Sequence, residues 1–187
     1  MTMRKSIISL CVLCLSGCVP SLHELYTADT LVYDPAIVGT WQQDDERWQF
    51  KGDPNDRSYD LMITKKQEIP SKLIGHLVEI ERQRFLDLYP SDDTKLETGD
   101  WIKFQLVPAH LFLSIKKEND MLVMTAMDPD AIRKMLEKRP DWIKHEVIKD
   151  DRVVLTAQPK QLQKFLLEGL KTEGFFGKAT EFTPVQE

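Results

Sequence analysis

The stretch GTWQQDDERWQF, residues 39–50, decides the fold because it carries the pattern that recurs through most of the chain. At its end, Trp48 and Phe50 alternate with polar neighbours, which is the two-residue period of a half-buried β-strand. The acidic run at residues 44–46 lies between two strand-like halves and favours a solvated hairpin turn. The sequence GDPND, residues 52–56, then ends the strand. The stretch therefore predicts two antiparallel strands.

Segments with the same period recur between turn signals. Two of them, residues 73–80 and 83–90, are separated only by Glu81 and Arg82, so we expect a hairpin there. Further segments of this kind lie at residues 58–64, 101–107, 110–115, 121–127 and 152–156. About eight strands joined by short loops favour an antiparallel barrel or sandwich. We expect a mainly β fold built as an antiparallel up-and-down barrel.

Two segments have a helical period instead. Residues 128–140 begin with an aspartate N-cap followed by a proline, and Pro140 ends the helix. Residues 159–171 also begin with a proline, and apolar side chains recur along them at intervals of three and four residues. We therefore expect two helices that pack on the β core.

Length and composition restrict the class of protein. The 187 residues suit one domain, and 42% hydrophobic with 29% charged residues is ordinary for a globular fold. The formal net charge is -5, and no basic cluster with interleaved aromatic residues is present. Because an acidic protein gains nothing from counterion release, we expect no nucleic-acid partner.

The first residues have the pattern of a secretory signal. Arg4 and Lys5 are followed by an apolar run of about ten residues and then by Ser16 and Gly17, which are small. The apolar run is too short to cross a bilayer core, which needs about 20 residues. All three cysteines lie here with the spacing C-x2-C-x3-C, but two of them would be removed with a signal over residues 1–17. We therefore expect no metal site, disulfide or redox pair at these cysteines.

The tetrapeptide LSGC, residues 15–18, resembles the lipobox of bacterial lipoproteins. The resemblance implies that diacylglycerol is attached to the Cys18 thiol, that the chain is cleaved before Cys18, and that the new amino group is acylated, as with palmitate. In the family's sorting rule an aspartate after the cysteine favours the inner membrane. Val19 in that position implies the outer membrane, with the domain facing the periplasm. We expect residues 18–35 to be a lipidated N-terminus and tether, and residues 36–187 to form a single β-rich domain.

The tripeptide GTW, residues 39–41, is similar to the Gly-x-Trp motif that opens the first strand of lipocalins. This resemblance implies an eight-stranded barrel with Trp41 closing one end, a helix along the wall, and a basic side chain stacked on the tryptophan, a role that Arg152 could take. The chain departs from the lipocalin pattern in two ways. The helix expected at residues 129–139 interrupts the last two strands, and no Thr-Asp-Tyr equivalent is found.

No motif for a catalytic or metal site stands out in the sequence. The acidic runs at residues 44–46 and 53–56 lack the spacing of a calcium loop. His76 and Glu79 would face opposite sides of a strand, and the other histidines are scattered. Neither a G-x-S-x-G elbow nor a glycine-rich phosphate loop is present. We expect no catalytic residue, no metal and no cofactor other than the covalent lipid on Cys18.

Aromatic side chains within the strand-like segments are the candidate ligand-binding residues. They either fill the barrel interior or line a cavity for an apolar ligand. The candidates are Trp41, Trp48, Tyr59, Phe104 and Phe112. We expect a non-enzymatic, membrane-anchored envelope protein that binds an apolar small molecule or another envelope component. A filled barrel that docks a protein partner on its outer surface, as envelope assembly factors do, stays open as an alternative, and a hydrolase is a second one.

Overall fold

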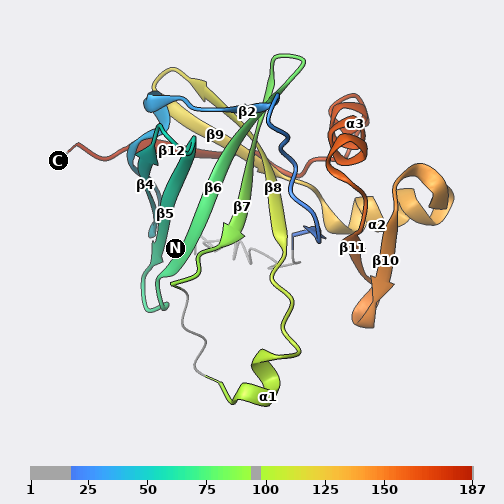
Figure 1. Ribbon diagram of the computed structural model, residues 1–187. Coiled ribbons are helices and arrows are strands. Elements are labelled where there is room, and N and C mark those ends of the chain that lie inside the picture. The colour runs from blue at the N-terminus through green and yellow to red at the C-terminus, as the bar shows by residue number, and fades with distance from the viewer. Residues whose placement is uncertain (1–17, 94–97, 187) are drawn as a thin grey trace, which may run out of the picture.

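Eight strands form a closed antiparallel barrel in the computed structural model, which describes residues 18–93 and 98–186 (Figure 1). The expected mainly β, up-and-down barrel is confirmed. The expected signal, residues 1–17, lies outside the described residues. In ring order the strands are β3 (Gly39–Gln43), β4 (Glu46–Asp53), β5 (Ser58–Lys65), β6 (Ser71–Ile80), β7 (Gln83–Pro90), β8 (His110–Glu118), β9 (Met121–Ala126) and β12 (Thr180–Pro184).

The hairpin predicted from residues 39–50 is confirmed. Trp41 of β3 lies opposite Trp48 of β4, and the two strands are joined at Asp44 and Asp45. The backbone of Asp44 has a φ of 51°, in the left-handed region that aspartate tolerates better than most residues. The acidic run is therefore a turn, as its composition predicts.

The second predicted hairpin, β6–β7, turns on residues with unfavourable turn chemistry. Ile80 lies opposite Gln83, so only two residues connect the strands. Those residues, Glu81 and Arg82, have φ values of 50° and 67°. Two consecutive positive φ values are typical of the type I′ turn that matches strand twist. Glycine usually occupies such positions, and neither residue here is a glycine. Pairing of β6 with β7 over eight residue pairs holds the turn in place instead.

The strand that closes the barrel is β12, and the expectation that residues 152–156 provide it is wrong. β12 pairs with β3 on one side and with β9 on the other. The segment Arg152–Leu155 does form a strand, β11, but it pairs with β10 (His145–Ile148) and β1 (Pro20–Ser21). These three strands extend the sheet outward from β8. The cation over the Trp41 ring is Lys117, 5.9 Å from its centroid, and not Arg152.

Residues 101–107 are also not a strand. β7 pairs directly with β8, from Phe85 opposite Ser114 to Leu88 opposite Leu111, so the intervening segment has no position in the barrel. It projects from the barrel end as a loop with the four-residue helix α1 (Asp100–Lys103) near its tip (Figure 1). We call residues 98–109 the finger. Its apolar residues follow a strand-like pattern, but they find no neighbouring strand to pair with.

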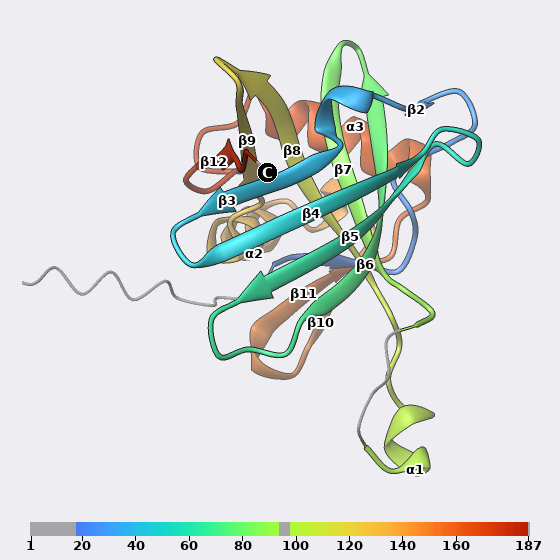
Figure 2. The ribbon, with the colours of Figure 1, turned by 90° about the vertical axis from the view of Figure 1, so that its left-hand side faces the viewer.

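The two predicted helices are confirmed as α2 (Pro129–Lys138) and α3 (Pro159–Gly169). Asp128 caps α2 by accepting a hydrogen bond from the Ala131 N–H at 2.8 Å. Both helices lie on the side of the barrel away from β4 and β5 (Figure 1, Figure 2). Among the described residues, no helix has the length and apolar content to cross a membrane. The remaining short elements are β2 (Leu31–Val32) and the 3₁₀ turns η1 (Pro35–Ile37), η2 (Pro140–Trp142) and η3 (Lys149–Asp151).

The segment expected to be a tether, residues 18–35, is instead packed on the body. Val19 is 2% exposed and Leu25 is fully buried among side chains of the helix-side core. β1 in this segment pairs with β8 and β11, and β2 pairs with β6. Its apolar residues, Val19 and Leu25 among them, fix the segment to the barrel wall. The folded body therefore begins next to Cys18.

Candidate functional site

The barrel interior is filled by side chains. Trp41, Trp48 and Tyr59, three of the five candidate ligand-binding residues, are between 0% and 8% exposed. They pack in one continuous cluster with Ile37, Phe50, Leu61, Leu77, Leu86, Leu88, Ile115, Leu122, Met124 and Phe182. Near Ile37 and Lys117, at one end of the barrel, a void of about 20 Å³ has room for about one water molecule. The aromatic side chains therefore form a packed core here.

Tyr59 also closes this cluster with hydrogen bonds. Its hydroxyl donates to the Asp34 carbonyl at 3.1 Å and accepts from the Asp34 N–H at 2.8 Å, while its ring stacks on Tyr33. Burial raises the pKa of Tyr59 to about 12, against the lowering effect of its hydrogen bond to the Asp34 main chain. The hydroxyl thus stays protonated and ties the end of the barrel to the segment before β3.

The other two candidates lie outside the barrel interior. Phe112 is buried, but on the outer face of β8, where it packs in the cluster under α2 and α3. Phe104 lies on the finger and is 84% exposed. The expectation that all five aromatic residues share one site is wrong, because Phe112 faces the helices and the finger is not a strand.

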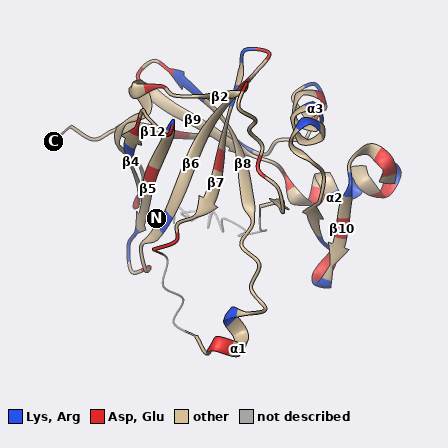
Figure 3. Ribbon diagram, in the orientation of Figure 1, with Lys and Arg blue, Asp and Glu red and all other residues tan. Residues whose placement is uncertain are grey.

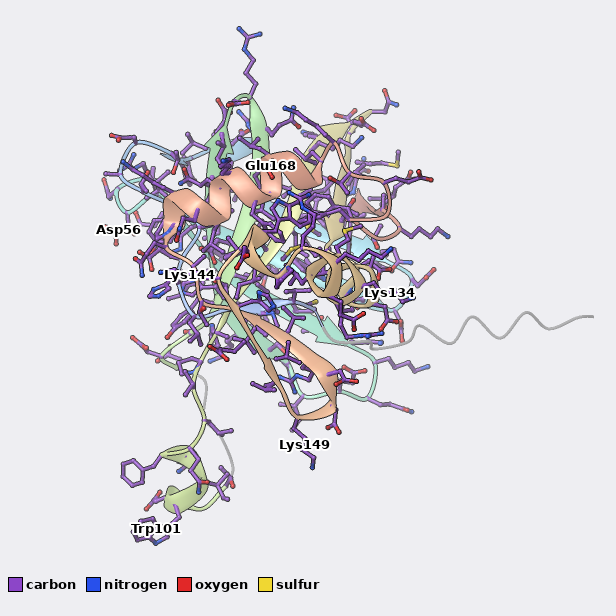
Figure 4. All side chains as sticks on the ribbon, turned by 90° about the vertical axis from the view of Figure 1, so that its right-hand side faces the viewer. Asp56, Trp101, Lys134, Lys144, Lys149 and Glu168 are labelled. Atoms are coloured by element: carbon purple, nitrogen blue, oxygen red, sulfur yellow. The ribbon has the colours of Figure 1, made fainter. Side chains whose placement is uncertain are left out.

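A groove of about 830 Å³ lies on the helix side of the molecule, between α3 and the start of the β10–β11 hairpin. Residues 139–146 and Thr156 line one side, and Gln161, Lys164, Phe165 and Glu168 of α3 line the other. Figure 4 shows Glu168 on α3 and Lys144 at the start of the hairpin, on opposite sides of this region. The groove is large enough for several side chains of a bound peptide.

Trp142 organises the groove. Its indole N–H donates to a Glu168 carboxylate oxygen at 2.6 Å, and the Arg139 guanidinium lies over its ring at 4.2 Å. The ring edge meets Phe165, with 4.8 Å between centroids, so the aromatic floor is held rigidly. Lys144 and Lys164 add positive charge and Glu146 adds negative charge around this floor. The groove therefore offers an apolar floor with polar groups of both signs at its rim.

The free edge of β10 continues from the groove. The Lys144 carbonyl accepts from the Thr156 N–H at 2.9 Å, so alternate residues of β10 direct their main-chain groups toward β11. His145 and Val147 consequently direct their N–H and C=O groups away from β11. No other described strand pairs with β10. The edge can thus accept another strand.

Histidines that are scattered in the sequence meet at one buried aspartate. Asp87 is fully buried, and its carboxylate lies 2.8 Å from His110 Nδ1 and accepts from the Leu25 N–H at 2.7 Å. His76 lies opposite Asp87 on β6 and contacts the ring of Tyr26. The hydrogen bonds of Asp87 fix the N-terminal segment and β8 to β7, so this cluster has a structural role.

Cys18, the expected lipidation site, is exposed at the first described position. It lines a hollow of about 290 Å³ with the start of α2 and with Asp150, Asp151 and Arg152 at the β10–β11 turn. Because Val19 is already buried, a lipid on Cys18 would be attached almost directly to the folded body.

No sequence motif indicates the groove, because its lining residues come from three separate segments of the chain. Within residues 18–93 and 98–186, no group of three or more histidine, cysteine, aspartate or glutamate side chains is placed to hold a metal ion. Comparison with protein-family models, with curated proteins and with solved structures finds no match for this chain.

Proposed function

We propose that the protein is a bacterial envelope lipoprotein that binds an extended segment of another envelope protein on the outside of its barrel. The observation that carries this proposal is the contrast between the two candidate sites. The interior cluster around Tyr59 is packed, whereas the groove beside α3 is open and adjoins an unpaired strand edge. An outer docking site therefore has more support than an apolar ligand inside the barrel.

The free edge favours a strand-like occupant. An added strand would hydrogen-bond to the main-chain groups of His145 and Val147. These hydrogen bonds would supply affinity whatever the amino-acid sequence of the bound segment. Its alternate side chains would reach the floor formed by Trp142 and Phe165. The mixed charges at the rim fit a segment that carries both signs.

The anchor is the second part of the proposal. We assign the lipid to Cys18, with the outer membrane as destination and the periplasm as the space that the domain faces. Two or three acyl chains would give the stable attachment that a single chain does not. With Cys18→Ser, the precursor should keep its signal and incorporate no labelled fatty acid. Labelling that persists in this variant would place the lipid elsewhere.

The groove is tested by site-specific photo-crosslinking in the bacterial envelope. A photoreactive side chain at Lys144 should give a discrete crosslinked protein, whereas one at Asp56 should not. Asp56 is on the β4–β5 turn, and β4 and β5 lie across the barrel from β10 (Figure 1). Digestion of the crosslinked product should locate the bond in one extended segment of the partner.

A proline variant tests the strand edge. Val147→Pro removes a main-chain donor that points away from β11, so the fold should be kept while the crosslink at Lys144 is lost. Glu146→Pro is the matched control, because it removes a ladder hydrogen bond and should lower stability. Equal crosslinking in Val147→Pro and the parent protein would contradict strand addition.

A further inference from the structure

We propose that the finger, residues 98–109, is a second membrane-contacting element that inserts its aromatic side chains into the bilayer surface to which the protein is anchored. The inference extends the proposed function, because it takes the orientation of the body from a lipid on Cys18. It assigns a lipid surface as the partner of residues that have no role in the barrel or in the groove.

The finger exposes an unusual amount of apolar surface. Its exposed side chains are Trp101 (84%), Ile102 (50%), Phe104 (84%), Leu106 (50%) and Val107 (73%). None of the five belongs to either hydrophobic core, and the ring of Trp101 meets only that of Phe104 among the aromatic pairs of the described chain. Contiguous exposed apolar residues of this kind mark an interaction surface.

The finger begins close to the anchor. Ser21 pairs with His110, the first residue of β8 after the finger. Cys18 is three positions before Ser21 in the chain, and Val107 is three positions before His110. Three positions of extended chain span at most about 11 Å. With about 5 Å between paired strands, Cys18 lies within about 27 Å of Val107. Residues 19–35 are packed on the barrel, so no flexible linker separates a lipid on Cys18 from the folded body. The body would therefore stay close to the bilayer.

Neighbouring features lie on the same side of the molecule. The β10–β11 turn, marked by Lys149 in Figure 4, points toward the side on which Trp101 projects, and the turn adjoins Cys18. The β5–β6 turn is at the same barrel end as the finger and exposes Ile69 by 87%. The finger, the β10–β11 turn and the exposed Ile69 are thus directed to one side.

The chemistry of the finger suits the bilayer interface. Tryptophan is enriched at the headgroup level, and lysine can extend its amine toward water. The charges of α1, Lys103 and Asp100, pair with each other at 3.3 Å (Figure 3). At the same barrel end, the negative charges of Asp44 and Asp45 offset the positive charges of Lys65 and Lys66. Attraction to anionic lipid is therefore not what holds the finger at the bilayer. Binding should therefore be apolar and only weakly dependent on salt.

Vesicle binding by an unlipidated protein tests the finger separately from the anchor. The chain 18–187 with Cys18→Ser, which contains every described residue, is mixed with vesicles of phosphatidylcholine whose acyl chains carry bromine. Bromine should quench the fluorescence of Trp101 in the parent, at low and at high salt. The double variant Trp101→Ala, Phe104→Ala should lower vesicle partitioning about tenfold.

Leu170→Ala, on an exposed side chain after α3, is the matched control and should partition like the parent. The double variant should unfold like the parent, because neither side chain is buried. Equal partitioning of the double variant and the parent would overturn the inference, as would vesicle binding without quenching. Finger-dependent binding to a protein, without binding to vesicles, would also overturn it. None of these outcomes depends on whether Cys18 is lipidated.

Discussion

Asp87 connects more of the chain than any other polar residue described inside the molecule. Its two carboxylate oxygens bind the main chain at Leu25 and the ring of His110, which joins β7 to the N-terminal segment and to β8. A buried carboxylate is stable only when its oxygens have such partners. The residue therefore explains why the segment after Cys18 is held on the barrel wall.

Replacing Asp87 should destabilise the fold strongly. Asp87→Ala leaves the buried Leu25 N–H without an acceptor, and the free energy of unfolding should fall by about 2–4 kcal/mol in urea titrations. Asp60→Ala, on the exposed face of β5, should change it by less than about 0.5 kcal/mol. Similar values for the two variants would show that Asp87 does not hold the N-terminal segment.

His76 should make stability depend on pH. Burial lowers its pKa from 6.5, Asp87 raises it in part, and His110 lowers it further. Because the folded state binds the proton less well than the unfolded state, the stabilising contribution is complete above about pH 6.5 and is lost as pH falls below that value. His76→Gln should flatten the decrease in the free energy of unfolding between about pH 7 and pH 5. An unchanged slope would mean that His76 is not the group responsible.

At the residue scale, alternation predicted part of the interior. Trp41, Trp48 and Tyr59 lie in strands with one apolar face, and each is inside the barrel. In β8 both faces are covered, one by the interior and one by the helices, so Leu111, Phe112 and Leu113 are consecutive apolar residues. A continuous apolar run gives no information on which face points inward.

At the element scale, the sequence pattern does not predict β12, and it predicts a strand in the finger where there is none. β12 has only one buried side chain, Phe182, so its pattern is too weak to indicate a strand. The finger has five apolar residues in a strand-like order but no partner strand. Whether each segment forms a strand depends on pairing with a neighbouring strand, and the local sequence pattern does not specify that pairing.

Two phenylalanine variants distinguish these elements. Phe182→Ala should lower the free energy of unfolding by about 3–5 kcal/mol, because the ring is 3% exposed and packs against Trp48. Phe104→Ala should change it by less than about 0.5 kcal/mol, because its ring is exposed. Denaturant unfolding of both variants checks this. A large loss for Phe104→Ala would mean that the finger belongs to the folded core.

The packing of α3 against the following segment has its own test. A methyl group at Gly169 would lie far inside van der Waals contact with the buried Phe175 ring, so Gly169→Ala should lower stability by about 1–3 kcal/mol. Gly99→Ala, where no atom lies within 4 Å of the added group, should have little effect. Equal melting temperatures for both variants would contradict the close approach of α3 to Phe175.

At the scale of the whole molecule, the barrel is a rigid core with different surfaces on different sides. The finger and the β5–β6 turn project from one end, and α2, α3 and the β10–β11 hairpin cover one wall (Figure 1, Figure 2). The sequence could predict a closed β fold with two helices from period and turn signals. It could not predict the groove, because that site depends on how α3 and the hairpin pack after the chain has folded.

A barrel with a packed core and a binding groove on its outside should hold no apolar molecule in its interior. Native mass spectrometry of the full-length protein, extracted from membranes in detergent, tests this most directly. We expect the mass of a chain that begins at Cys18 with covalent acyl groups and no further apolar molecule. A stoichiometric apolar ligand that leaves only when the protein is denatured would contradict a packed interior, because the ligand would have to occupy the barrel.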